Sequence, residues 1–293
     1  MRLDDLRGSS NIENQRGMGG GGGGGGLGGL LPLLFMGRGL GLGGVILLVI
    51  LAFAFGINPF GGGSGTPRQP VGQQVGQQTS PETAAADQFV ARVLETTETT
   101  WSKIFAAEGQ DYPEPTLVLY DGFGQSGCGA AQAATGPFYC PADRKVYLDT
   151  SFFDELSRRF GAPGDFAAAY VIAHEVGHHI QTVTGVADQV RSAQAKAGER
   201  EANALQVRME LQADCYAGLW GRDNAQRLEP GDIEEAMRAA ESIGDDTLQR
   251  QSQGRVVPDS FTHGSSEQRM RWFMAGYQQG SVAACDTFNA RTL

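Results

Sequence analysis

The feature that most limits what this chain can fold into is the stretch 171–181, VIAHEVGHHIQ, which holds three of its four histidines. Here His174, Glu175 and His178 form the pattern His-Glu-x-x-His. On an α-helix, side chains four residues apart project from the same face, so the two imidazoles can share one zinc ion. Glu175 can then reach a water molecule beside that zinc. The apolar spacing of residues 166–183 predicts the helix that this geometry needs.

Two neighbours of the motif carry separate predictions. Gly177 is a weak helix former, and its place inside the motif indicates that something passes close to the backbone there. His179 points about 100° away from His178 around the helix, so it cannot bind the same metal and is interpreted as a structural or surface histidine. The competing interpretation of the whole stretch is an amphipathic helix whose histidines only pack or face solvent.

A third zinc ligand should lie downstream, because catalytic zinc takes three protein ligands and leaves one position for water. His263, the fourth histidine, is one candidate. The favoured candidates are Glu210 and Asp214, which share a face of the helix predicted around them. One carboxylate can bind zinc while the other accepts the spare N–H of a ligating histidine. The alternative is a solvated helix face, where most charged pairs lie.

These residues resemble known families. His-Glu-x-x-His followed on a later helix by Glu-x-x-x-Asp is the pattern of the gluzincins, such as thermolysin-like metallopeptidases. The chain is more similar still to the bacterial family called putative neutral zinc metallopeptidases. The segments that carry this resemblance are SGCGAAQAATGPFYCPADRKVYLD, HEVGHHIQ, ELQADCYAGLW, HGSSEQR and the N-terminal RLDDLRGSSNIENQRG. They cover most of the chain outside its Gly-rich and Gln-rich parts.

The resemblance implies a zinc peptidase with one Zn²⁺ per chain and assigns a role to each residue of the motifs. It implies three zinc ligands, which are His174, His178 and Glu210. Glu175 is implied as the catalytic base, and Asp214 as the acid that orients a ligand. Thermolysin-like enzymes place a later histidine beside the zinc, which implies His263 as the donor to the oxyanion. Arg269 is then expected to orient His263 or to bind a substrate carboxylate. The alternative for His263 is a surface or helix-capping histidine.

The N-terminal third has a different composition. Residues 1–38 are polar and then glycine-dominated, residues 39–57 carry no charge, and residues 58–83 form a linker rich in Gly, Pro and Gln. An uncharged apolar run of 19 residues is long enough to span a bilayer. We therefore expect residues 39–57 to be a single transmembrane signal anchor, with a buried core helix as the alternative.

Basic residues near this run predict its orientation in the cell membrane. More of them precede it than follow it closely: Arg2, Arg7, Arg16 and Arg38 against Arg68. The positive-inside rule then predicts a single-pass protein with a cytoplasmic N-terminus and an extracytoplasmic catalytic domain. Cleavage after the apolar run is the less favoured alternative, because the segment before it is longer than a usual signal peptide n-region.

Charge and cysteine content agree with export. The formal net charge of −10 argues against nucleic acid as a partner. Four cysteines form an even set, which predicts a local disulfide Cys128–Cys140 and a second disulfide Cys215–Cys285. A zinc site made of cysteines is the weaker alternative, since no Cys-x-x-Cys spacing exists, and free cysteines are expected if the domain faces the cytoplasm.

Residues 84–293 are expected to form one α+β domain with a small sheet and active-site helices, in agreement with the zincin plan. The predicted strands are 115–121 and a hairpin within 138–149 that supplies the sheet edge beside the site. An extended peptide could bind that edge by strand addition. A short helix is predicted at 151–161, and longer helices are predicted at 87–109, 166–183, 186–220, 231–244 and 265–279.

The function predicted from these patterns is a membrane-anchored zinc peptidase, most simply an endopeptidase, that acts on peptides or unfolded proteins. The alternative is a catalytically silent zinc scaffold that binds peptides or protein partners, which the intact Glu175 argues against. A purely structural zinc site is a third interpretation. Three ligands without an obvious fourth argue against it, because structural zinc sites are closed.

Overall fold

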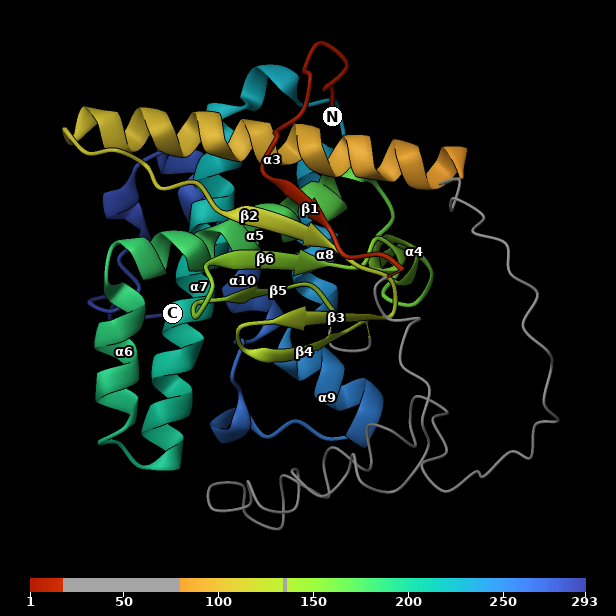
Figure 1. The fold of residues 1–293 in the computed structure, drawn as a ribbon. Coiled ribbons are helices and arrows are strands. Elements are labelled where there is room, and N and C mark those ends of the chain that lie inside the picture. Colours follow the sequence, from red (N-terminus) through yellow and green to blue (C-terminus); the bar gives the residue numbers. More distant parts are fainter. Residues whose placement is uncertain (18–79, 134–135) are drawn as a thin grey trace, which may run out of the picture. The chain divides into compact units, whose positions relative to one another are not determined.

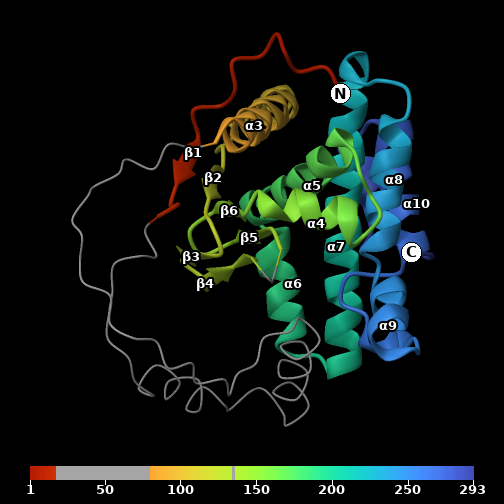
Figure 2. The same cartoon turned by 90° about the vertical axis from the view of Figure 1, so that its right-hand side faces the viewer.

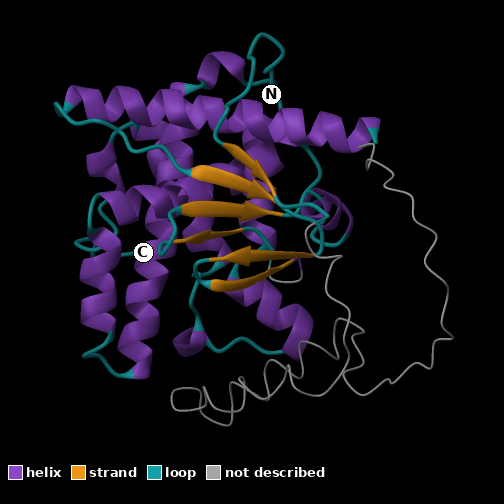
Figure 3. Ribbon diagram, in the orientation of Figure 1, coloured by secondary structure: helices purple, strands orange, loops and turns teal. Residues whose placement is uncertain are grey.

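The fold is α+β, with a small sheet on one side of a central helix and a layer of helices on the other (Figures 1 and 2). The computed structural model describes residues 1–17, 80–133 and 136–293. Apart from one long helix between the first two strands, the strands precede the run of helices along the chain, and Figure 3 shows the strands gathered together beside the helices. The predicted α+β class is confirmed for the described part of the chain.

The main sheet has four strands in the order β1-β2-β6-β5. Their bounds are β1 (Ile12–Asn14), β2 (Thr116–Leu119), β5 (Phe138–Cys140) and β6 (Lys145–Leu148). The strands β1, β2 and β6 are parallel, whereas β5 turns back antiparallel to β6. The predicted hairpin within 138–149 is confirmed, and β5 is an edge of the sheet.

A second hairpin, which the sequence patterns did not predict, lies between β2 and β5. It pairs β3 (Phe123–Ser126) with β4 (Gly129–Gln132). Its residues are mostly exposed and rich in Gly and Ala, so no alternation of apolar and polar side chains marks it as sheet. The predicted disulfide Cys128–Cys140 is present and ties the turn of this hairpin to the end of β5.

The helices follow the predicted order with two differences. Their bounds are α3 (Pro81–Ala107), α4 (Ser151–Arg158), α5 (Asp165–Val183), α6 (Val186–Gln194), α7 (Glu199–Asp223), α8 (Asp232–Ser242), α9 (Asp245–Gln253) and α10 (Ser266–Gln279). The single helix expected at 186–220 is two helices, because the chain turns between Gln194 and Glu199. The polar helix α9 was not among the predicted helices, since it has too few apolar residues to show a helical period.

Two glycines let α7 and α10 pack backbone to backbone. A Cβ on Gly218 would lie 1.9 Å from the carbonyl oxygen of Phe273, and a Cβ on Gly276 would lie 1.9 Å from that of Cys215. Only glycine fits at such a distance. The second predicted disulfide, Cys215–Cys285, is present and fixes α7 to the segment that follows α10.

Residues 1–17 depart from the expected domain boundaries. The sequence pattern placed them in a segment, 1–38, separate from a domain that starts at 84. In the structure they form one compact unit with residues 80–293, and β1 joins the main sheet. The expected transmembrane helix 39–57 lies outside the described residues. Within the described ranges, no helix combines the length and the apolar character that a bilayer crossing requires.

Candidate metal centre and active site

Helices α5 and α7 approach closely at the point where the metal-binding motif lies. A Cβ on Gly177 would lie 3.0 Å from Cα and 3.1 Å from the carbonyl oxygen of Ala213. The prediction that something passes close to Gly177 is therefore confirmed, and the neighbour is the backbone of α7. This contact brings Glu210, one turn before Ala213, opposite the two histidines of the motif.

The side chains of His174, His178 and Glu210 converge on one point. One ligand atom from each lies within 4.8 Å of the others. Oε2 of Glu210 is 3.2 Å from Nε2 of His174 and 3.4 Å from Nε2 of His178. Around a tetrahedral zinc with bonds of about 2.1 Å, neighbouring ligand atoms lie about 3.4 Å apart. The three side chains therefore fit a zinc ion with little movement.

Burial and charge prepare these groups for a cation. Burial would raise the pKa of Glu210, but the two histidines outweigh it and hold that pKa well below the usual carboxyl range. Burial would likewise lower the pKa of His178, but Glu210 raises it above the usual histidine value. Without a metal ion, the negative charge of Glu210 is balanced by the imidazoles that contact it. A zinc ion would take the place of the protons on the imidazoles.

His174 is oriented by its neighbours so that Nε2 faces the centre. Its Nδ1 lies 2.8 Å from Oδ1 of Asp214. Burial would raise the pKa of Asp214, but Arg269 and His174 lower it to about 2, so its carboxylate is charged and Nδ1 of His174 is the donor. Nε2 is then the ring nitrogen left to bind a metal once its proton is displaced.

Arg269 does not lie where the sequence analysis expected it. It is 3% exposed, and its guanidinium makes two hydrogen bonds of 2.9 Å to the two oxygens of Asp214. It also donates to the hydroxyl of Tyr170, which itself donates to Asp214. The expectation that Arg269 orients His263 or binds a substrate carboxylate is wrong. Its position on α10, packed against α7 through glycines, directs it to Asp214 instead.

His178 is oriented by a residue that the sequence analysis missed. Its Nδ1 lies 2.9 Å from Oε1 of Gln181. Because an amide oxygen can only accept a hydrogen bond, Nδ1 of His178 is the donor. The amide nitrogen of Gln181 donates to the carbonyl oxygen of Met209 and to Oε1 of Gln212 on α7. This fixes the amide, so Nε2 of His178 is left for the metal. The spacing of three residues between His178 and Gln181 was the available signal.

Glu175 lines a cavity beside the metal cluster. The cavity has a volume of 390 Å³, and its walls come from α5, α6, α7, the loop around His263 and the edge strand β5. Burial raises the pKa of Glu175, although the two histidines of the motif partly oppose this. A carboxyl group with a raised pKa can both accept and return a proton near neutral pH.

His263 lies at the rim of the same cavity. Its ring is 51% exposed, and Nδ1 lies 3.2 Å from Oδ1 of Asp245. The other oxygen of Asp245 accepts from the backbone N–H groups of Thr262 and His263, each at 2.6 Å. Burial would lower the pKa of His263, but the hydrogen bond to Asp245 raises it above its usual value. Asp245 is therefore a residue that orients His263.

His179 has a structural position, which was one of the two roles expected for it. Its ring is buried, and Nε2 donates to the carbonyl oxygen of Pro113. Nδ1 then accepts from the hydroxyl of Tyr139 on β5, at 3.1 Å. The histidine next to the metal motif thus connects the metal-binding helix to the edge strand.

His179 should make the folded state sensitive to acid. Burial lowers its pKa to about 4, against about 6.5 in an unfolded chain. Between these values the unfolded state binds more protons, so stability present above pH 6.5 is lost as pH falls towards 4, by at most about 3 kcal/mol. His179→Gln keeps a donor for Pro113 and cannot titrate. Chemical unfolding at a series of pH values should give a flatter curve for this variant, and coincident curves would contradict the assignment.

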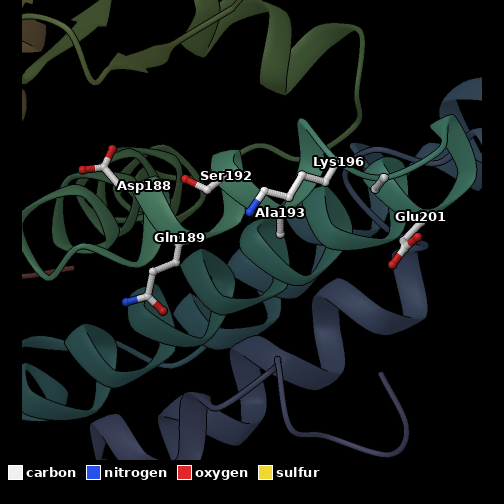
Figure 4. Close-up of a pocket in the computed structure, with 7 residues that line it drawn as sticks. Asp188, Gln189, Ser192, Ala193, Lys196 and Glu201 are labelled. Carbon is white, nitrogen blue, oxygen red and sulfur yellow. The ribbon is translucent and has the colours of Figure 1, made fainter.

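The larger cavity of 610 Å³ is not part of this centre. It lies along α6 and the start of α7 and is lined by Asp188, Gln189, Ser192, Ala193, Lys196, Ala197 and Glu201 (Figure 4). None of the metal-cluster residues contributes to it. Its side chains are mostly charged or small and come from one helical hairpin, so it is an open groove on the surface.

Comparison with known proteins places the chain in a family. A family model described as putative neutral zinc metallopeptidase matches residues 1–288. The uncharacterised protein YpfJ of Escherichia coli is 50% identical, over 98% of this chain and 99% of its own length. An uncharacterised protein of Mycobacterium tuberculosis is 44% identical over 62% of this chain and 65% of its own. No solved structure matches the chain significantly.

Proposed function

Since the chain belongs to the putative neutral zinc metallopeptidase family, we propose that it is a zinc-dependent peptidase that hydrolyses peptide bonds of peptides or unfolded proteins. One observation carries this proposal. Three metal-binding side chains converge on one point, and Glu175 lines a cavity that opens beside them. A structural zinc site would have its fourth position closed by protein, whereas this one faces a cavity.

We propose one zinc ion per chain, held by His174, His178 and Glu210. Bound there, zinc would act as a Lewis acid that polarises the scissile carbonyl and lowers the pKa of water to about 7. Asp214 and Gln181 would hold the two imidazoles in the tautomer that leaves Nε2 free.

Glu175 is the proposed proton carrier. Its carboxylate takes a proton from the attacking water as the C–O bond forms, and it returns the proton to the amine nitrogen as the C–N bond breaks. Its location in the cavity, next to the histidines, fits both transfers. The raised pKa of Glu175, which follows from burial, favours the return of the proton to the leaving group.

His263 is proposed to stabilise the negative charge that develops on the carbonyl oxygen. Because Asp245 holds Nδ1, the ring nitrogen left for substrate is Nε2. The raised pKa of His263 means that Nε2 carries a proton over a wider pH range. A donor that is already placed before the reaction stabilises an oxyanion without reorganisation.

The edge strand β5 is the proposed binding place for the substrate backbone. Phe138 and Tyr139 of this strand line the cavity together with Glu175 and His178. The side of β5 that does not pair with β6 is free to pair with an extended peptide, since β5 ends the sheet order. Backbone pairing is independent of side-chain identity, which is compatible with unfolded proteins as substrates.

The two disulfides support a location for the folded unit in an oxidising compartment. We therefore propose an extracytoplasmic peptidase attached to the cell membrane through the apolar run 39–57. The net charge of −10 leaves no reason to propose a nucleic-acid partner.

Metal removal tests the proposal. The purified full chain should contain about one zinc and should cleave unfolded casein. A chelator should abolish cleavage, and stoichiometric zinc should restore it, because the ligand positions are set by the fold and not by the metal. Zinc bound without cleavage of any unfolded substrate would favour the silent scaffold. A chain that binds no zinc would refute the ligand set.

A further inference from the structure

Residues 1–17 are part of the sheet and not a tail. Strand β1 pairs in parallel with β2, in the register Ile12 to Leu117 and Asn14 to Leu119. Backbone hydrogen bonds of 2.8 Å extend this pairing at both ends of the strand. Removing β1 would leave β2 as an unpaired edge with buried side chains beneath it.

At the C-terminal end of this segment, Arg16 is bound by residues of the folded unit. The side chain of Arg16 is 9% exposed and pairs with Asp87 at 2.6 Å and with Asp121 at 3.0 Å. It also donates to the hydroxyl of Thr150 at 3.0 Å. Since Asp87 lies in the first two turns of α3, the chain leaves this unit after residue 17 close to the point where it returns at residue 80.

The N-terminal end of the segment is also held by the folded unit. The side chains of Met1 and Leu3 lie in the hydrophobic core. Asp5 forms an ion pair with Arg227, and the guanidinium of Arg2 donates to the carbonyl oxygen of Gln226. The segment is therefore bound along its whole length, from the loop before α8 to the start of α3.

This packing gives the arginines of the segment a role other than orienting a membrane span. Arg2 and Arg16 were counted as cytoplasmic charges that orient a membrane span. In the structure their guanidinium groups bind acceptors within the folded unit, and this is sufficient reason for basic residues at these positions. Their count therefore does not report on which side of a membrane the N-terminus lies.

We infer that residues 1–17 and residues 80–293 lie on the same side of any membrane to which the protein is attached. A chain segment whose two ends belong to one folded unit crosses a bilayer an even number of times, zero included. This excludes the single crossing at 39–57 with a cytoplasmic N-terminus that the sequence pattern favoured. With the two disulfides, it places the N-terminus outside the cytoplasm together with the catalytic unit.

The test uses two single-cysteine variants of the full chain. Ser10→Cys and Ser192→Cys each place one thiol on an exposed side chain, the first before β1 and the second on α6. The native cysteines are all in disulfides, so the parent chain is the blank for labelling. Spheroplasts of an expressing bacterium are treated with a membrane-impermeant maleimide before and after lysis.

Both variants should be labelled to the same extent before lysis. Labelling of both only after lysis would still support a shared side, and would move the whole unit into the cytoplasm. Labelling of Ser192→Cys before lysis and of Ser10→Cys only after it would overturn the inference. The inference does not depend on peptidase activity, so an inactive protein would leave this result readable.

Discussion

Glu175→Gln should reduce kcat for peptide cleavage by at least about 1,000-fold while the zinc content stays unchanged. The amide has the same shape as the carboxyl group but cannot take a proton from water. Glu175 is not one of the three converging ligands, so its loss leaves the metal cluster intact. Zinc content by atomic emission and casein cleavage by peptide release measure the two effects on the same sample.

The matched control for this variant is Glu201→Gln, which makes the same change at an exposed position in the first turn of α7. It should keep both zinc and activity. If Glu175→Gln retained more than a tenth of the activity, another group would have to carry the proton. If it lost zinc, Glu175 would be part of the metal site and the assignment of roles would fail.

Arg269→Met should destabilise the protein by about 4 kcal/mol and weaken zinc binding by about 10- to 100-fold. Asp214 is fully buried, and Arg269 supplies two of its hydrogen bonds. Without the guanidinium a buried carboxylate loses its charged partner, and its hold on His174 loosens. Denaturant unfolding and competition with a zinc chelator measure the two losses.

Arg271→Met, two residues along α10, is the control for Arg269→Met. Arg271 is exposed, pairs across one turn with Glu267 and donates to the carbonyl oxygen of Leu293, so its loss should cost less than about 1 kcal/mol. Adding Asp214→Asn to Arg269→Met removes the stranded charge and should recover part of the stability but not the zinc affinity. Equal effects of Arg269→Met and Arg271→Met would show that Arg269 does not hold the site.

The predictable parts of the site are those that depend on local spacing. A helix places His174 and His178 on one face whatever surrounds it, and the same holds for Glu210 and Asp214 on a second helix. The disulfides were predictable because four cysteines offer few pairings, and the short separation of Cys128 and Cys140 in the sequence favours a local one. The hairpin that supplies β5 was predictable too, because Pro141, Ala142 and Asp143 form a typical turn between its two strands.

The tertiary structure decided which side chains far apart in the sequence contact one another. Arg269 binds Asp214 and not His263 because Gly218 and Gly276 bring α10 against α7, a contact that leaves no local pattern. Asp245, the first residue of α9, orients His263 in the loop before α10, and the polar sequence of α9 gave no helical pattern from which this could be predicted.

The place of residues 1–17 shows the same limit most clearly. Read alone, MRLDDLRGSSNIENQRG is polar and mixed in charge, and its arginines let it pass for a cytoplasmic tail. Its strand has only three residues, too few to show an alternation of apolar and polar side chains. Arg16 forms its ion pair with a residue more than 70 positions away in the sequence. Local spacing therefore determined the metal motif, and only long-range packing decided what belongs to the folded unit around it.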